Sequence, residues 1–215
     1  MDPGQIERDV EGCLVAHHHL LASIEHLTDD DVRNPSALPG WTLGHVLTHL
    51  ARNADGLARM LEGAARGEQA PMYDSWEART RDIDVGAGRP ASVLRDDVRT
   101  TCAALEVWLR TTADRGWEGT GITLLGPVPV AEVPWRRRRE VVVHESDLGL
   151  GAGPADWPAD FVRAELGRLT MLWASRRPMG MTDLPAAALA LADHQRLAWL
   201  LGRITVDGLE PAGVL

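Results

Sequence analysis

Two pairs of side chains in this sequence have the spacing of metal ligands on helices. His45 and His49 lie four residues apart, and so do Glu140 and His144. Residues four apart share one face of a helix, so Glu140 and His144 could hold one ion and a histidine from a facing helix could complete it. Three protein ligands with one open position is the arrangement of catalytic zinc. Nickel, iron and manganese also accept nitrogen and oxygen donors.

The same spacing has a purely structural interpretation. Glu140 could be a surface partner of the arginine run 136–139, and His144 could be a core histidine. We expect the run itself to form a solvated face, because four consecutive helical residues point around the whole circumference. At most one or two of these arginines could then face a metal.

Other histidines and the cysteines favour structural roles. Consecutive residues on a helix diverge by about 100°, so His17, His18 and His19 cannot share one ion, and we expect one to be buried and two exposed. Cys13 and Cys102 fall on apolar helix faces, which predicts inert core cysteines.

The spacing of apolar residues predicts a mainly α chain. A polar connection precedes Thr42, a suitable N-cap for the second helix. Val141, Val142 and Val143 favour a strand within the fourth helix, which leaves an ambiguity there. The expected helices span residues 3–27, 42–63, 91–115 and 135–150, with a short helical piece near 75–79 in the long connection 64–89 and a loop or extended segment at 119–129.

A change of composition divides the chain. Residues 149–158 contain three glycines and two prolines, which is typical of a domain boundary. The prediction is a four-helix bundle over residues 1–152 and a smaller C-terminal region over residues 153–215. Two more helices are expected in that region, at 159–176 and 187–203.

Charge and composition exclude several classes of protein. The net charge is −9 and the pI is about 5.3, whereas phosphate recognition requires a basic face, so no nucleic-acid partner is expected. The start of the sequence lacks the features of a signal peptide, and no apolar run reaches the roughly 18 residues of a membrane span. We therefore expect a cytoplasmic protein. Its oligomeric state stays open, with a monomer as the default. Its 22 basic residues are all arginine, which suggests a GC-rich bacterial genome.

Three segments resemble known motifs. Residues 40–50, Gly-Trp-Thr-Leu-Gly-His-Val-Leu-Thr-His-Leu, are similar to the second-helix signature of the DinB-like metalloenzymes. Residues 139–149, Arg-Glu-Val-Val-Val-His-Glu-Ser-Asp-Leu-Gly, resemble the fourth-helix signature of the mycothiol-dependent maleylpyruvate isomerase branch. Residues 198–203, Ala-Trp-Leu-Leu-Gly-Arg, resemble a motif near the end of that branch. The resemblance covers nearly the whole chain.

This resemblance implies a site and a reaction. The metal ligands would be His49, Glu140 and His144, with zinc as the expected ion, and His45 would have a supporting or packing role. The cofactor would be mycothiol, a thiol of actinobacteria. Its metal-bound thiolate would add to the double bond of a maleyl-type cis diacid, and elimination after bond rotation would give the trans isomer. The same thiolate could serve a mycothiol S-transferase that acts on another electrophile.

Two further residues could have roles at the site, Asp147 because of its place on the fourth helix and Arg203 because of the resemblance. Asp147, close to His144 on the same helix, could hydrogen-bond that ligand and fix its tautomer, or could be a solvated helix-end aspartate. Arg203 would bind a substrate carboxylate, or else be a plain helix-end cation. Trp41 and Trp135, near the starts of the ligand helices, could line the mouth of the pocket.

One part of the sequence departs from the family. The segment between Trp173 and Arg203 is shorter than expected for the family's sterol-carrier-like second domain, and strands are hard to find in residues 179–191. Two other hypotheses therefore stay open. The protein could be a bundle that binds metal or a small molecule without turnover, or a structural bundle whose histidines merely pack.

Overall fold

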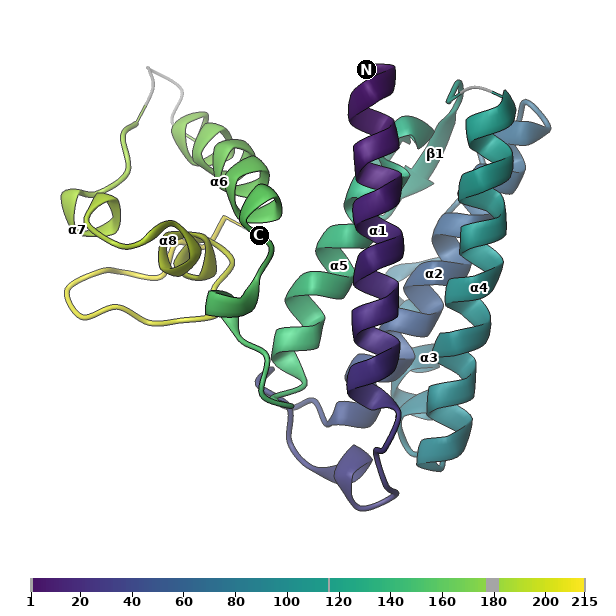
Figure 1. The fold of residues 1–215 in the computed structure, drawn as a ribbon, viewed down its shortest axis with the longest axis horizontal. Helices are drawn as coiled ribbons and strands as arrows, with labels where there is room; N and C mark the ends of the chain where they lie inside the picture. Colours follow the sequence, from purple (N-terminus) through teal and green to yellow (C-terminus); the bar gives the residue numbers. More distant parts are fainter. Residues whose placement is uncertain (1, 116, 177–181, 215) are drawn as a thin grey trace. The chain divides into compact units, whose positions relative to one another are not determined.

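The protein is described by a computed structural model over residues 2–115, 117–176 and 182–214 (Figure 1). The chain divides into two compact units, Met1–Leu150 and Gly151–Leu215. Within the described residues, no helix combines the length and the apolar character that crossing a membrane requires.

Four long helices form the first unit. They are α1 (Pro3–Ile24), α2 (Leu43–Ala65), α4 (Ala91–Arg115) and α5 (Val133–Asp147). Both α1 and α2 pack against α4 and α5, and α1 and α5 run in one direction along the bundle while α2 and α4 run in the other (Figure 1). The predicted mainly α bundle is confirmed. Leucines and other apolar side chains on the inward faces fill the core, among them Leu20, Leu47, Leu50, Leu57, Leu94 and Leu105.

The valine triplet at 141–143 is helical and buried, so the expected helix is present in spite of the β-branched side chains. Burial on the bundle interior outweighs the local preference of these residues for a strand. The helix spans Val133–Asp147, which is slightly earlier than the predicted range of 135–150.

The start of α2 is fixed by the predicted cap. The hydroxyl of Thr42 accepts from the backbone N–H of His45, and His45 Nδ1 accepts from the backbone N–H of Thr42 at 3.1 Å. This reciprocal pair satisfies two N–H groups that the first turn leaves unpaired. The pair thereby fixes the residue at which the helix that carries His49 begins.

The connection between α2 and α4 contains more structure than predicted. The expected short helical piece is the 12-residue α3 (Trp76–Ala87), which begins after the N-cap Ser75 and packs against α2. The packing is close at Gly44, where an added Cβ would lie 2.2 Å from the carbonyl oxygen of Ala87. The sequence interpretation of residues 64–89 as mainly loop was therefore wrong, because a packed partner stabilises a helix whose own sequence is largely polar.

A small hairpin occupies the segment predicted as a loop or extended. Strands β1 (Thr120–Thr123) and β2 (Gly126–Pro129) pair antiparallel and are joined by the two-residue turn Leu124–Leu125. Ile122 also exchanges backbone hydrogen bonds with Ala70 and Met72. The hairpin is thereby attached to the chain that leads into α3.

The second unit contains the longer α6 (Ala159–Ala174) and the short α7 (Ala186–Leu189) and α8 (Asp193–Leu200). The predicted single helix 187–203 is interrupted between Leu189 and Asp193. The guanidinium of Arg196 donates hydrogen bonds to the backbone oxygens of Ala188, Leu189 and Leu191 at this break. Within 151–176 and 182–214 there is no strand, and part of the segment expected to lack strands, residues 179–181, lies outside the described residues.

Candidate metal centre

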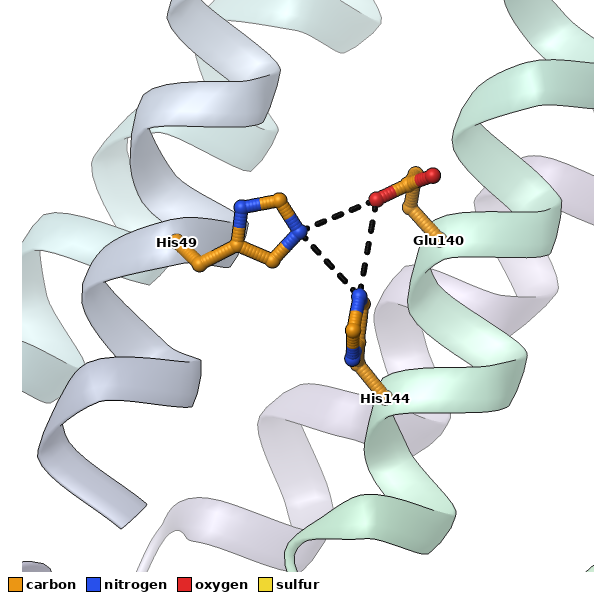
Figure 2. A group of neighbouring side chains, drawn as sticks. All are labelled: His49, Glu140 and His144. Carbon is orange, nitrogen blue, oxygen red and sulfur yellow. Dashed lines mark hydrogen bonds and ion pairs between the residues drawn. The ribbon is translucent and has the colours of Figure 1, made fainter. Parts of the chain in front are cut away.

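Three predicted ligand side chains meet between α2 and α5. His49 extends from α2, and Glu140 and His144 lie one turn apart on α5 (Figure 2). His49 Nε2 lies 3.0 Å from Glu140 Oε2 and 3.1 Å from His144 Nε2. The third distance, from His144 Nε2 to Glu140 Oε2, is 3.6 Å. Side chains that are 91 and 95 residues apart in the sequence thus bring one oxygen and two nitrogens to one point.

These distances fit a metal ion. Bonds of about 2.0–2.1 Å in a tetrahedral zinc site place neighbouring ligand atoms about 3.3 Å apart. The three observed separations bracket that value. Among the described residues, one group of three or more histidine, cysteine or acidic side chains has donor atoms close enough together to hold an ion, and it is this one.

Protonation of the three groups is shaped by burial and by their contacts. Burial lowers the pKa of His49 to about 4, and the charges of His144 and Arg79 act in the same direction. Burial alone would raise the pKa of Glu140, but hydrogen bonds from His144 and His49 hold it well below its usual range. At neutral pH the site therefore offers a neutral imidazole and an ionised carboxylate, which are the forms that bind metals.

His144 differs from the other two groups. Burial alone would lower the pKa of His144, but hydrogen bonds with Asp147 and Glu140 outweigh burial and raise the pKa above its usual value. Its Nδ1 lies 2.8 Å from Asp147 Oδ2, and Asp147 is 1% exposed. A carboxylate there accepts the Nδ1 proton and keeps Nε2 directed at Glu140 and His49. The solvated interpretation of Asp147 is excluded, and the contact expected from the sequence is present.

His45 lies outside the cluster. Its Nδ1 completes the cap of α2, and its ring stacks on Trp41 at 6.1 Å. Trp41 also lies against His49, with 5.7 Å between ring centroids. Trp135 is buried, 8% exposed, so it packs within the bundle instead of standing at an open mouth. The predicted packing role of His45 and the proximity of Trp41 to the site are present in the structure.

Arg79 of α3 was missed by the sequence interpretation. Its Nη2 donates to His49 Nδ1 at 3.1 Å. Because Arg79 can only donate, His49 Nδ1 must accept, so the hydrogen of the neutral ring lies on Nε2 and is donated to Glu140. An exposed-looking arginine on a polar helix gives no sequence signal of this contact, although the Ser75 cap could have indicated the helix itself.

A pocket of about 190 Å³ opens beside the cluster. His49 and Glu140 form part of its wall, and apolar side chains from α2, α3 and the hairpin turn form another part. Three arginines also line it, Arg79, Arg136 and Arg139. We call this the Arg79 pocket.

The arginine run does not form the solvated face expected from the sequence. Arg137 is fully buried, and Arg138 is 6% exposed. Arg137 donates to the carbonyl of Leu50, to Asn53 Oδ1 and to His17 Nε2, and its Nη2 lies 3.3 Å from Cys102 Sγ. The prediction failed because these acceptors come from three other helices, so the burial of the arginine depends on the assembled bundle.

This network also accounts for the histidine triplet. His17 is buried, and His18 and His19 are exposed, as predicted. His17 Nε2 accepts from Arg137, so its Nδ1 carries the hydrogen and donates to Glu106 Oε1 at 2.9 Å. The two cysteines are buried core residues, as predicted.

Arg203 lies in the second unit, just after α8. Its Nη1 donates to the carbonyl of Leu201 at 2.8 Å, and Gly202 between them has a positive φ of 70°, a conformation that favours glycine. Its assignment to a substrate carboxylate therefore stays a prediction.

A helical bundle with carboxylate and histidine side chains directed inward from facing helices belongs to the class of bundles that build metal sites in their cores. Comparison with known proteins gives the particular family. Residues 13–149 match the model of the mycothiol maleylpyruvate isomerase N-terminal domain. Since this match covers well over half of the chain, the protein belongs to that family.

Solved structures agree with this assignment. The chain is similar to a crystal structure of the mycothiol-dependent maleylpyruvate isomerase, with a TM-score of 0.81 and 27% identity over 92% of this chain and 89% of that one. A histidine-to-alanine mutant of such an isomerase gives the same TM-score and coverage at 26% identity. A search of curated proteins found no match.

Proposed function

We propose that this protein is a metal- and mycothiol-dependent isomerase that converts a maleylpyruvate-type cis diacid to its trans isomer. The observation that carries the proposal is the convergence of His49, Glu140 and His144 within 3.0–3.6 Å, in a chain of this family. The solved isomerase structures with which the chain aligns along most of its length support it.

In this proposal His49, Glu140 and His144 hold the ion, and zinc suits their two nitrogens and one oxygen. When bound, the metal and mycothiol would supply a thiolate that adds to the cis double bond and leaves after rotation. Asp147 keeps the Nδ1 hydrogen on His144, so that Nε2 offers its lone pair.

The Arg79 pocket would admit the substrate to this site. Its apolar wall includes Leu57 and Met72, which limit water around the reacting atoms. Its volume of about 190 Å³ is below the roughly 300 Å³ at which pockets for drug-sized ligands begin, so a small diacid suits it.

The first test is metal content together with turnover. Purified protein should contain about one equivalent of a divalent ion, and His49→Ala and His144→Ala should lose it. His18→Ala, an exposed histidine on α1, serves as the matched control and should retain the ion. Equal metal content in all four proteins would refute the site.

Metal-loaded protein with mycothiol should then convert maleylpyruvate to the trans product with no net consumption of thiol. A stable thioether in place of the trans isomer would identify an S-transferase. Absence of both products across a panel of electrophiles, with the ion bound, would favour a non-catalytic binding module.

A further inference from the structure

The side chains around the Arg79 pocket give it an unbalanced positive charge. Three guanidinium groups line it, whereas Glu140 is the carboxylate in its wall. Arg136 is paired with Glu132, whose Oε2 receives two hydrogen bonds at 2.7 and 3.0 Å. Arg139 Nη2 lies 3.6 Å from Glu140 Oε1. A divalent ion at the cluster would make the pocket still more positive, so its ligand should be an anion.

Of the three arginines that line the pocket, Arg79 is the one whose contacts among the described residues are with uncharged rings. Its guanidinium lies 5.8 Å from the ring centroid of Tyr73 and 6.0 Å from that of Trp76. Within the described part of the chain, Arg79 forms no ion pair with a carboxylate. The rings hold the planar group in place without neutralising it, and such a group binds a carboxylate through two parallel hydrogen bonds.

Coordination of an ion by His49 Nε2 would end the hydrogen bond from Arg79 to His49. A histidine that binds a metal through Nε2 carries its ring hydrogen on Nδ1. Nδ1 could then no longer accept from Arg79 Nη2, which now lies 3.1 Å away. Binding of the ion would therefore leave this guanidinium N–H for another acceptor, in the pocket that Arg79 and His49 both line.

A second polar group, the hydroxyl of Tyr73, lies beside Arg79: burial raises the pKa of Tyr73, and the charge of Arg79 acts in the opposite direction. The hydroxyl oxygen of Tyr73 is buried, and no hydrogen bond of ordinary geometry reaches it among the described residues. Tyr73 lines the same pocket as Arg79. Buried polar groups are normally satisfied, so this hydroxyl indicates a place for a ligand's acceptor atom.

We propose that Arg79, assisted by Arg139 of α5, binds a carboxylate of the substrate in the pocket next to the metal cluster. This deepens the proposed function, on which it rests, by assigning the recognition of the anionic group to the helical bundle itself. In this role Arg79 selects anionic electrophiles over neutral ones, since a neutral ligand would leave its charge uncompensated.

The test uses maleate, a small cis dicarboxylate, as a binding probe for the full-length, metal-loaded protein. Titration followed by calorimetry should show that Arg79→Gln weakens maleate binding by about tenfold to a hundredfold, the usual loss of a hydrogen bond to a charged group. Arg79→Lys should give an intermediate value, because it keeps the charge and loses the planar fork. Metal content should be unchanged in both variants.

Arg81→Gln is the matched control, since Arg81 lies on the same helix, is 67% exposed and pairs with Asp82. It should bind maleate as the unsubstituted protein does. Equal maleate affinity of Arg79→Gln and Arg81→Gln, or no maleate binding by the unsubstituted protein, would overturn the inference. Loss of metal from Arg79→Gln would overturn it in favour of a role in positioning His49.

Turnover separates this inference from the proposed function. Arg79-dependent maleate binding without isomerisation would support the anion site and refute the isomerase. Isomerisation with a KM that is unaffected by Arg79→Gln would support the isomerase and refute the anion site at Arg79.

Discussion

At the scale of single residues, the protonation of the candidate ligands determines how the site can be loaded. His49 is neutral and Glu140 is ionised at neutral pH, because the pKa of the first is lowered to about 4 and that of the second lies well below its usual range. The pKa of His144 is raised instead. Between the pKa of His49, about 4, and the raised pKa of His144, a metal ion therefore competes with a single proton, the one on His144.

This predicts the direction of the pH dependence of metal affinity. As the pH falls through the raised pKa of His144, the affinity should fall by about tenfold per pH unit, and above that pKa it should level off. Asp147→Asn should move the onset of this loss to lower pH, because it removes the carboxylate that stabilises protonated His144. On the plateau it should weaken binding by roughly 10- to 100-fold. Competition with a chromophoric chelator at a series of pH values measures both effects.

Glu145→Gln is the control for this experiment. It removes a negative charge two residues before Asp147 on α5, from a carboxylate that contacts Ser23. Its affinity curve should coincide with that of the unsubstituted protein. If Asp147→Asn gave the same midpoint as Glu145→Gln, the hydrogen bond to His144 would have no part in loading the site.

At the scale of elements, the buried guanidinium of Arg137 connects α5 to the other helices of the bundle. It satisfies the carbonyl of Leu50, the amide of Asn53 and the ring of His17, all inaccessible or nearly so. Arg137→Met should lower the free energy of unfolding by about 3 kcal/mol or more, because the acceptors would be left buried without donors. Urea denaturation measures this change.

The neighbouring Arg136 provides the contrast. It makes a partly exposed pair with Glu132, so Arg136→Met should cost less than about 1 kcal/mol. Similar losses for the two variants would mean that Arg137 is not the anchor of α5.

Contact between α2 and α3 is the second feature at this scale. Gly44→Ala would direct a methyl group at the backbone of Ala87, which cannot turn aside as a side chain can. We expect α3 to shift and the protein to lose about 1–3 kcal/mol of stability, as with other overpacked sites. Arg79 would be displaced from His49 in the same variant, which a crystal structure would reveal.

Gly88→Ala is the matched change at the end of α3, where an added Cβ meets nothing within 4 Å and φ is an ordinary −82°. It should alter stability by no more than about 0.5 kcal/mol, or increase it slightly. If Gly44→Ala were equally neutral, the close approach of the two helices would not be a constraint.

The comparison of sequence with structure shows which elements are locally encoded. The Thr42 cap, the four bundle helices and the shared face of Glu140 and His144 follow from periodicity and spacing. The choice of His49 over His45 required the family resemblance, because spacing alone left both possible. The contacts of Arg79 and Arg137 could not be predicted from the sequence, since their partners lie on other helices. Nothing in the local sequence around an arginine distinguishes a buried guanidinium from a solvated one.

At the scale of the whole molecule, the three candidate ligands and the Arg79 pocket all belong to the unit Met1–Leu150, whereas Arg203 belongs to Gly151–Leu215. The isomerase structures align with 92% of this chain, so both units have counterparts in them. Loading of the ion and any contribution of Arg203 to substrate binding should therefore be separable by mutation.

Arg203→Gln tests that separation. If Arg203 binds a substrate carboxylate, the variant should keep its full metal content while its KM for the diacid rises about tenfold or more, the effect of losing a charged hydrogen bond. Arg163→Gln, an exposed arginine on α6, should change neither quantity. An arginine that binds the substrate carboxylate should raise KM when it is replaced. Unchanged kinetics in Arg203→Gln, combined with a raised KM in Arg79→Gln, would therefore assign carboxylate recognition to the bundle alone.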